Sequence, residues 1–173
     1  VRVLTLSEDK QILYIGGDFQ GPNSVMTEPR DYVAAVNAAT GAVMAWNPAP
    51  DGAVRAIVPV GSKVYLGGAF TTLMAGDIDR NGAARVGDVA SGGHVVDEFD
   101  PQCIGGAVNA IAVRPDGEVV YLAGDFRTVK GGAVRNRIAA FGTGGSAALL
   151  PWNPDCDGLI YDIVLSGDGK FLF

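Results

Sequence analysis

Residues 64–70 read VYLGGAF, and the chain contains two near-copies of this stretch. Residues 13–19 read LYIGGDF, and residues 120–126 read VYLAGDF. In each copy aliphatic and aromatic residues precede a pair of small residues, which is typical of a buried β-strand that leads into a tight turn. A stretch that returns at intervals of roughly 50 residues indicates a repeat architecture, so the rest of the unit should recur as well.

Three further segments recur with the same period. They are an apolar V-x-A-[IL] segment that begins at Val1, Val54, Val108 and Ile160, an arginine-led segment that begins at Arg30, Arg80 and Arg135, and an aromatic-x-Pro segment that begins at Trp46, Phe99 and Trp152. The starts of the apolar segment are 53, 54 and 52 residues apart. The chain therefore divides into repeats 1–53, 54–107 and 108–159 and a partial fourth repeat, 160–173, which we assign to a single domain.

Each full repeat reads as four short strands separated by turn sequences such as Pro115-Asp116-Gly117, and no segment has a sustained helical period. Four strands in a unit of this length predict an all-β fold built from β-propeller blades of four antiparallel strands. A parallel β-helix is the alternative, although its repeat would be shorter. We expect Trp46, Phe99 and Trp152 to be buried between blades.

About three and a third repeats fall short of a closed ring, which usually needs about 4 to 8 blades. We therefore expect the ring to be incomplete in this segment, with further blades supplied by the same or another chain. The chain begins at Val1, at the start of a strand pattern, and we interpret it as a processed or excised piece of a longer protein.

The combined pattern resembles the delta-60-type propeller repeat of bacterial extracellular proteins, and the resemblance covers the whole chain. It implies a propeller fold and a location outside the cell or on its surface. It implies no particular activity, because the repeated residues look architectural. The second repeat departs from the pattern at Ala69, Arg85 and Phe99.

Charge and hydropathy exclude two kinds of partner. The net charge is −6 with 13 basic residues and no basic stripe, so we expect no binding of nucleic acid. The longest apolar runs are far shorter than the roughly 18 to 20 residues that a membrane-spanning helix needs. We therefore expect no membrane span.

Cys103 and Cys156 occupy equivalent positions in consecutive repeats, 53 residues apart. Matching loops of neighbouring blades lie close together near a propeller axis, so the pair is a candidate disulfide that would persist in an oxidising compartment. Two alternatives remain open at this point: two separate core thiols, or pairing with cysteines outside the segment.

Residues 77–82 read DIDRNG and continue to Asp88, which matches the spacing of a calcium-binding loop. Asp77, Asp79, Asn81 and Asp88 are therefore candidate calcium ligands. The other interpretation is an ordinary loop without metal, because no helices flank the motif and Asp stands where Glu is usual.

Several aspartates should gather on the face that carries the blade-connecting loops. They are Asp77 and Asp79, together with the candidate binding-face residues Asp51, Asp100, Asp155 and Asp157. The first interpretation is that they cap turns and solvate loops. The others are cation binding and recognition of a polar ligand such as a glycan.

Opposite charges also recur within the unit. Arg30, Arg80 and Arg135 are present in every full repeat, whereas Asp18 and Asp125 stand in two of the three. This pattern predicts an ion pair within each blade, with Arg80 finding another acceptor.

No residues in the chain form a recognisable catalytic set. The single histidine, His94, lies in a glycine-rich stretch, which leaves a Cys/His metal site and a Ser-His-Asp triad without support. We therefore expect a non-catalytic scaffold for structural assembly or for recognition of a protein or glycan, with no cofactor; calcium binding is the alternative. The alternatives are a segment of a propeller enzyme, quinoprotein-like or polysaccharide-active, with catalytic residues elsewhere, and a calcium-stabilised surface assembly subunit.

Overall fold

A computed structural model describes residues 1–90 and 95–173, so His94 lies outside the described residues. The fold is all-β, as predicted, and contains three antiparallel sheets of three strands each. The first sheet consists of β1 (Val3–Leu6), β2 (Ile12–Gly16) and β3 (Val33–Asn37). The second consists of β4 (Val54–Val60), β5 (Lys63–Gly68) and β8 (Ala83–Gly87). The third consists of β9 (Val108–Val113), β10 (Val119–Gly124) and β13 (Ile138–Gly142).

Two short hairpins and one turn of 3-10 helix complete the described secondary structure. They are β6 (Thr72–Leu73) with β7 (Ile78–Asp79), β11 (Thr128–Val129) with β12 (Ala133–Val134), and η1 (Met74–Gly76). No helix in the described part of the chain is long and apolar enough to cross a membrane.

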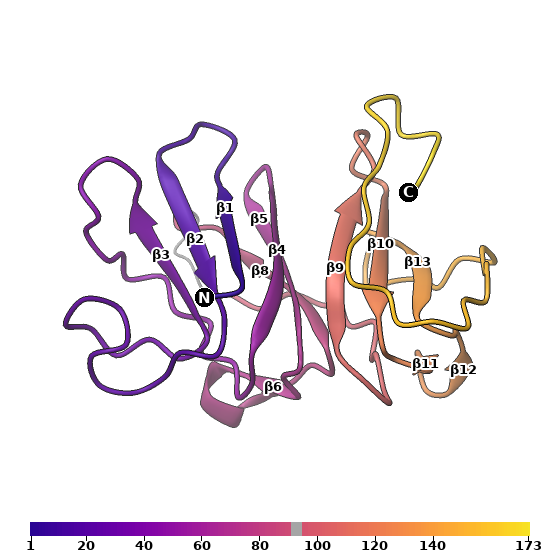
Figure 1. Ribbon diagram of the computed structural model, residues 1–173, viewed down its shortest axis with the longest axis horizontal. Helices are drawn as coiled ribbons and strands as arrows, with labels where there is room; N and C mark the ends of the chain where they lie inside the picture. Colours follow the sequence, from indigo (N-terminus) through magenta and orange to yellow (C-terminus); the bar gives the residue numbers. More distant parts are fainter. Residues whose placement is uncertain (91–94) are drawn as a thin grey trace.

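The three sheets have the same topology and stand side by side (Figure 1). In each sheet the second strand in sequence is central and pairs with the strands before and after it. β4 lies beside both β1 and β9, so the first strands of consecutive repeats are neighbours. The sequence repeat is therefore also a structural repeat.

Residues 160–173 continue this arrangement over the third sheet. The amide of Ile160 donates to the Gly124 carbonyl at 3.3 Å, just as the amide of Val54 donates to the equivalent Gly17 carbonyl at 3.3 Å. A single bridge joins Leu165 to Leu172. The fourth repeat thus starts in the same register as the second.

The fourth strand that the sequence predicts in each unit is a single β-bridge among the described residues. These bridges are Val36–Val43, Val86–Val96 and Phe141–Leu149, each at the free edge of its sheet. One bridge provides little backbone hydrogen bonding, so other contacts must hold the closing segment against the sheet.

The recurrent arginines provide these contacts, and the predicted ion pairs with Asp18 and Asp125 are not formed. In every full repeat the Nη2 atom of the arginine donates to the backbone carbonyl of the residue that follows the bridge. Arg30 donates to Met44 at 2.9 Å, Arg80 donates to Asp97 at 2.6 Å, and Arg135 donates to Leu150 at 3.2 Å. Asp18 instead pairs with Arg2, and Asp125 pairs with Arg137. A guanidinium with several donors in a fixed plane can bind carbonyls on both sides, which explains why arginine recurs here.

Consecutive sheets pack where a glycine of the central strand contacts the first residue of the next repeat, and we call this position the glycine seat. A Cβ atom added at Gly16 would lie 3.0 Å from Val54 Cγ1, and one added at Gly67 would lie 2.8 Å from Val108 Cγ1. The β-branched residue that opens the next repeat therefore packs directly against the backbone of this glycine in the first two sheets. In the third sheet Ala123 takes this place and packs with Ile163.

A recurring aromatic pair fills the space beside each seat. Edge-to-face contacts join Tyr14 to Trp46, Tyr65 to Phe99 and Tyr121 to Trp152, with ring centroids 5.2, 5.4 and 5.2 Å apart. Trp46 is 1% exposed and Phe99 is 0% exposed, as predicted. The prediction is wrong for Trp152, which is 38% exposed. Trp46 packs in a hydrophobic cluster with residues from all three strands of the second sheet. Trp152 is less covered because, among the described residues, the third sheet has only residues 160–173 over it.

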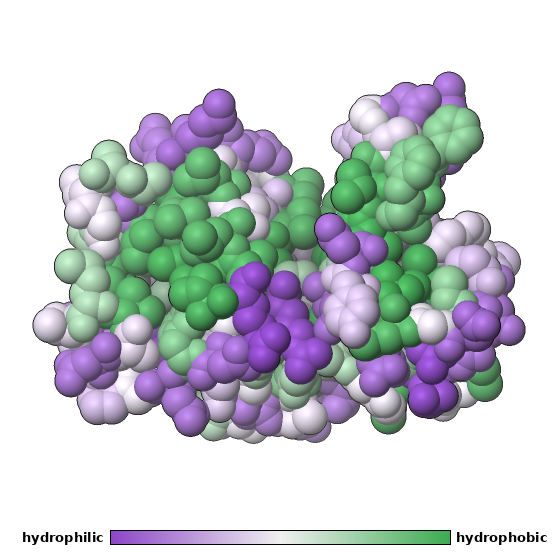
Figure 2. All heavy atoms as spheres, viewed as in Figure 1, coloured by the Kyte–Doolittle hydropathy of each residue, from purple (hydrophilic) through white to green (hydrophobic). Residues whose placement is uncertain are grey.

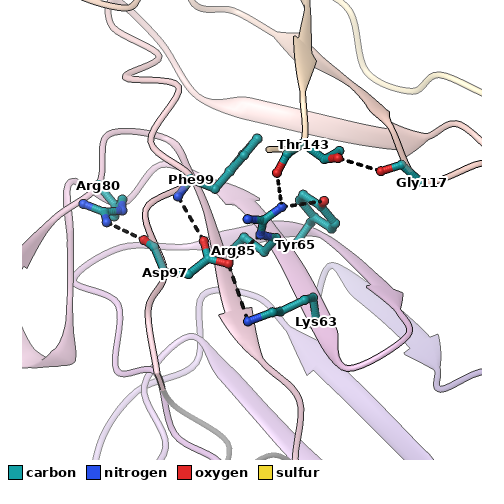
Figure 3. A network of polar contacts seen from close by, with 8 residues as sticks. All are labelled: Lys63, Tyr65, Arg80, Arg85, Asp97, Phe99, Gly117 and Thr143. Atoms are coloured by element: carbon teal, nitrogen blue, oxygen red, sulfur yellow. Dashed lines mark hydrogen bonds and ion pairs between the residues drawn. The ribbon is translucent and has the colours of Figure 1, made fainter. Parts of the chain in front are cut away.

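Arg85, which stands where the other repeats have alanine, connects the second sheet to the third repeat (Figure 3). Its Nε atom pairs with Asp97 at 2.6 Å, and its Nη1 atom donates to the Thr143 carbonyl at 2.5 Å. The guanidinium also lies 5.3 Å from the ring centroid of Phe99 and 5.6 Å from that of Tyr65. Arg85 and Phe99 are therefore one packed unit at this interface.

Candidate ligand-binding pocket

The candidate calcium ligands are not gathered around one point. Asp77 and Asp79 are exposed residues before and within β7, whereas Asp88 follows the far end of β8. Five strand residues at about 3.3 Å each separate that end from the 77–82 loop. The backbone carbonyl of Asn81 accepts a hydrogen bond from the Cys103 amide. In the described part of the chain, no three His, Cys, Asp or Glu residues lie together as metal ligands.

The four candidate binding-face aspartates have separate local environments. Asp51 accepts hydrogen bonds from the amides of Thr71 and Thr72 at 2.7 and 3.0 Å and from the Thr71 hydroxyl at 2.6 Å. Burial raises the pKa of this carboxyl, but the hydrogen bonds outweigh burial and hold the pKa below its usual value. Asp51 therefore acts as a turn cap.

The other three aspartates belong to the loops after the closing aromatic. Asp100 accepts from the Gln102 side chain at 3.0 Å, and Asp155 accepts from Asn136 at 2.7 Å. Asp155 also adopts a left-handed conformation, φ 55°, which aspartate tolerates better than most residues. Asp157 is exposed. These three positions do not form a common site.

The candidate disulfide is not formed, and both cysteines are free. Cys103 is buried among the residues between the second and third sheets, and burial raises the pKa of its thiol. Cys156 packs with the residues between the third sheet and the fourth repeat. The two thiols therefore lie in different interfaces, Cys103 between the second and third sheets and Cys156 between the third sheet and the fourth repeat.

A different site lies where the first strands of the repeats begin. A pocket of about 470 Å³ opens there and is lined by Arg2, Arg55, Ala69, Ala107, Asn109, Asp125, Leu159 and Tyr161. In Figure 2 hydrophilic residues gather near the N-terminus, between hydrophobic areas over the first and third sheets. The volume is within the range of about 300–1,000 Å³ that is usual for small-molecule sites.

Only three positions of the repeat supply the whole lining. The second position of the V-x-A-[IL] segment contributes Arg2, Arg55, Asn109 and Tyr161, the residue before that segment contributes Ala107 and Leu159, and the residue after the small pair of the central strand contributes Ala69 and Asp125. The neighbouring positions vary little: the residue at the glycine seat is small, and the residue that opens the next repeat is β-branched. The repeat thus presents different polar side chains from one fixed backbone position.

Hydrogen bonds connect these side chains across the repeats. Arg55 Nη1 donates to Asn109 Oδ1 at 2.9 Å, and Asn109 Nδ2 donates to the Ile160 carbonyl at 2.9 Å. Arg2 Nε lies 2.5 Å from Asp18 Oδ2, and this bond holds the pKa of Asp18 below its usual value. The polar floor of the pocket is therefore an ordered network.

Two hydrophobic side chains border the network and are open to solvent. The Tyr161 side chain is 76% exposed, and Leu159 is 41% exposed. Backbone hydrogen bonds fix the segment that carries them, because the Ile160 amide is bound to the third sheet. An exposed aromatic ring next to ordered donors and acceptors can contact both an apolar face and polar groups of one ligand.

This pocket was not predicted from the sequence, although the chain contains a signal for it. Arg2, Arg55 and Asn109 interrupt otherwise apolar strands, and an unpaired polar residue inside a buried strand is costly unless it reaches a partner or solvent. That interruption at one repeat position pointed to a shared polar site. No protein-family model and no curated protein matches this chain.

Proposed function

We propose that this chain is part of a non-catalytic β-propeller scaffold that binds a glycan in the pocket at the start of its first strands. Three sheets of identical topology, the recurring glycine seat and the recurring aromatic pair support the propeller. The resemblance to the delta-60-type repeat agrees with it and supports a location outside the cell.

Further blades, of the same or another chain, pack on the open face of the first sheet in this proposal. Val1 and Leu4 are 76% and 58% exposed, whereas the equivalent Val54 and Ile57 are 0% and 3% exposed against the first sheet. In Figure 2 hydrophobic residues gather over β1 and β2. A large exposed apolar face of this kind is usually an interaction surface.

The observation that carries the binding function is the lining of the pocket. Sugars present apolar C–H faces and edges of hydroxyl groups, so a site for them needs an accessible ring and a set of fixed donors and acceptors. The pocket offers the ring of Tyr161 beside the guanidinium of Arg55 and the amide of Asn109. These groups fit a sugar better than a purely apolar or a purely ionic ligand.

The same lining supports binding without hydrolysis. Glycosidases generally use two carboxyl groups about 5 to 9.5 Å apart. Among the described residues, Asp125 is the one carboxylate that lines the pocket, and it lies 3.7 Å from the guanidinium of Arg137.

Isothermal titration of the protein with a panel of neutral and acidic trisaccharides tests this proposal. We expect binding to at least one member of the panel, and we expect Tyr161→Ala to weaken it about tenfold, which is about 1.4 kcal/mol. Phe171→Ala is the matched control, because Phe171 is also exposed, at 61%, and does not line the pocket. Equal losses in both variants, or no binding to any sugar, would overturn the proposal.

A further inference from the structure

We infer that the pocket recognises an acidic sugar and binds its carboxylate through Arg55. This inference rests on the proposed glycan-binding function and specifies the class of sugar. It comes from the pairing of charges around the pocket, which is uneven.

Two of the three charged side chains that line the pocket have a partner of opposite charge. Arg2 pairs with Asp18 at 2.5 Å, and Asp125 pairs with Arg137 at 3.7 Å. Arg55 has no carboxylate within ion-pair distance in residues 1–90 and 95–173, and its hydrogen-bond partner is the neutral amide of Asn109. Arg55 therefore makes no ion pair of its own: the Asp18 carboxylate is bound by Arg2, and the charge of Arg55 acts on it only as a smaller contribution to its lowered pKa.

The guanidinium of Arg55 is also held in place for a ligand. Its Nη1 atom donates to Asn109, which is itself fixed by the bond to the Ile160 carbonyl. Its Nε atom is buried, as are those of Arg30, Arg80, Arg135 and Arg137, so the N–H groups of the two terminal nitrogens are the ones that can reach a ligand. A guanidinium has five N–H donors, so this one retains donors for a carboxylate after binding Asn109. Carboxylates bind such groups strongly, often through two parallel hydrogen bonds.

Uronic acids combine this carboxylate with the sugar ring that the Tyr161 side chain would contact. Arg55 and Tyr161 line the same pocket from the same position of two repeats. A simple anion such as phosphate would use the guanidinium and leave the exposed ring without a function. An acidic sugar uses both groups.

The overall charge of the protein opposes this preference but does not cancel it. The net charge of −6 repels a long polyanion, although salt screens charges beyond about 8 to 10 Å. The contact between Arg55 and a carboxylate is much shorter than that distance. Short acidic oligosaccharides are therefore the suitable probes.

The experiment compares acids with their neutral esters. Trisaccharides of galacturonic, mannuronic and guluronic acid and the methyl ester of each are titrated into the protein by calorimetry. We expect at least one acid to bind tenfold or more tightly than its ester. We expect Arg55→Gln to remove this difference, because the substitution removes the charge and keeps hydrogen-bonding capacity. Arg127→Gln, at an exposed site outside the pocket, should retain it.

The outcomes separate this inference from the function on which it rests. If acids and esters bound equally and Tyr161→Ala still weakened their binding, the acidic preference would be overturned and glycan binding would remain supported. Binding to no sugar at all would overturn both. Retention of the acid preference in Arg55→Gln would also overturn the assignment. Because the wild-type comparison of acid and ester needs no variant, the inference remains falsifiable if Arg55→Gln does not fold.

Discussion

The indole Nε1 of Trp46 donates a hydrogen bond to the carbonyl oxygen of Gly87 at 2.8 Å and so connects the closing segment of the first repeat to β8 of the second. Phe99, the equivalent residue in the second repeat, has no donor. There Arg85 Nη1 donates to the carbonyl of Thr143 in the third repeat instead. Two different side chains therefore make the same kind of connection at consecutive interfaces.

Trp46→Phe should destabilise the protein by about 1 to 3 kcal/mol, because it preserves most of the ring packing but leaves the buried Gly87 carbonyl without its donor. The free energy of unfolding in urea measures this loss. Trp152→Phe is the control, since Trp152 is 38% exposed, and its cost should be below about 1 kcal/mol. Similar costs in the two variants would contradict the role of the indole hydrogen bond.

Arg85→Ala should cost about 2 to 4 kcal/mol, because it leaves the half-buried Asp97 carboxylate and the Thr143 carbonyl with fewer donors. Phe99→Trp should also destabilise the protein, since a larger ring would meet the guanidinium of Arg85. The double variant reproduces the alanine and tryptophan of the first repeat. Its measured cost should be smaller than the sum of the two single costs by at least about 1 kcal/mol. Additive costs would show that Arg85 and Phe99 do not substitute for a tryptophan.

Gly67→Ala should cost about 1 to 3 kcal/mol, because the new Cβ would lie 2.8 Å from Val108 Cγ1 and 3.0 Å from Ile111 Cδ1. Combining it with Val108→Ala makes room for the methyl group, so the cost of the pair should be less than additive. Gly142→Ala is the control, since the nearest atoms to its Cβ would be 3.9 Å away. Thermal and urea unfolding of the wild type, both single variants, the double variant and the control provide the comparison. If Gly67→Ala did not change stability, the glycine would not be needed for the packing of the two sheets.

The recurring strands could be predicted from the sequence because each of them appears three times. The copies of VYLGGAF identify one strand of every unit, and the burial of Trp46 and Phe99 follows from their equivalent positions. Trp152 differs for a reason that its own residues do not encode. Its burial depends on how much of the next repeat lies over it.

The hydrogen-bond acceptors of the recurrent arginines could not be predicted from the sequence. The recurrent arginines bind backbone carbonyls rather than aspartates, and sequence shows only which side chains are present, not which carbonyls lie within reach. The pocket was missed for a related reason. Its residues are far apart in sequence, and only the side-by-side arrangement of first strands places Arg55 next to Asn109.

Asp51 should make stability depend on pH. Its carboxyl has a lowered pKa in the folded state, mainly through hydrogen bonds from Thr71 and Thr72 that outweigh the effect of burial. The ionised form therefore stabilises the fold at pH values above the unfolded pKa of 3.8, and this contribution is lost as pH falls through the lower folded value.

The unfolding free energies of the wild type and Asp51→Asn, measured between about pH 6 and about pH 2.5, test this expectation. The difference between the two proteins should be largest at the upper end and shrink below about pH 4. A difference that is independent of pH would exclude ionised Asp51 as the turn cap. Asp157→Asn, at an exposed residue, should change the free energy by no more than about 0.5 kcal/mol.

A crystal structure of the protein with a bound uronic acid trisaccharide would show directly whether the sugar occupies the pocket. We expect one sugar ring against the Tyr161 side chain and a carboxylate within about 3 Å of the Arg55 guanidinium. A sugar bound instead at the loops that carry Asp100, Asp155 and Asp157, or a pocket that stays empty at saturating sugar, would contradict it.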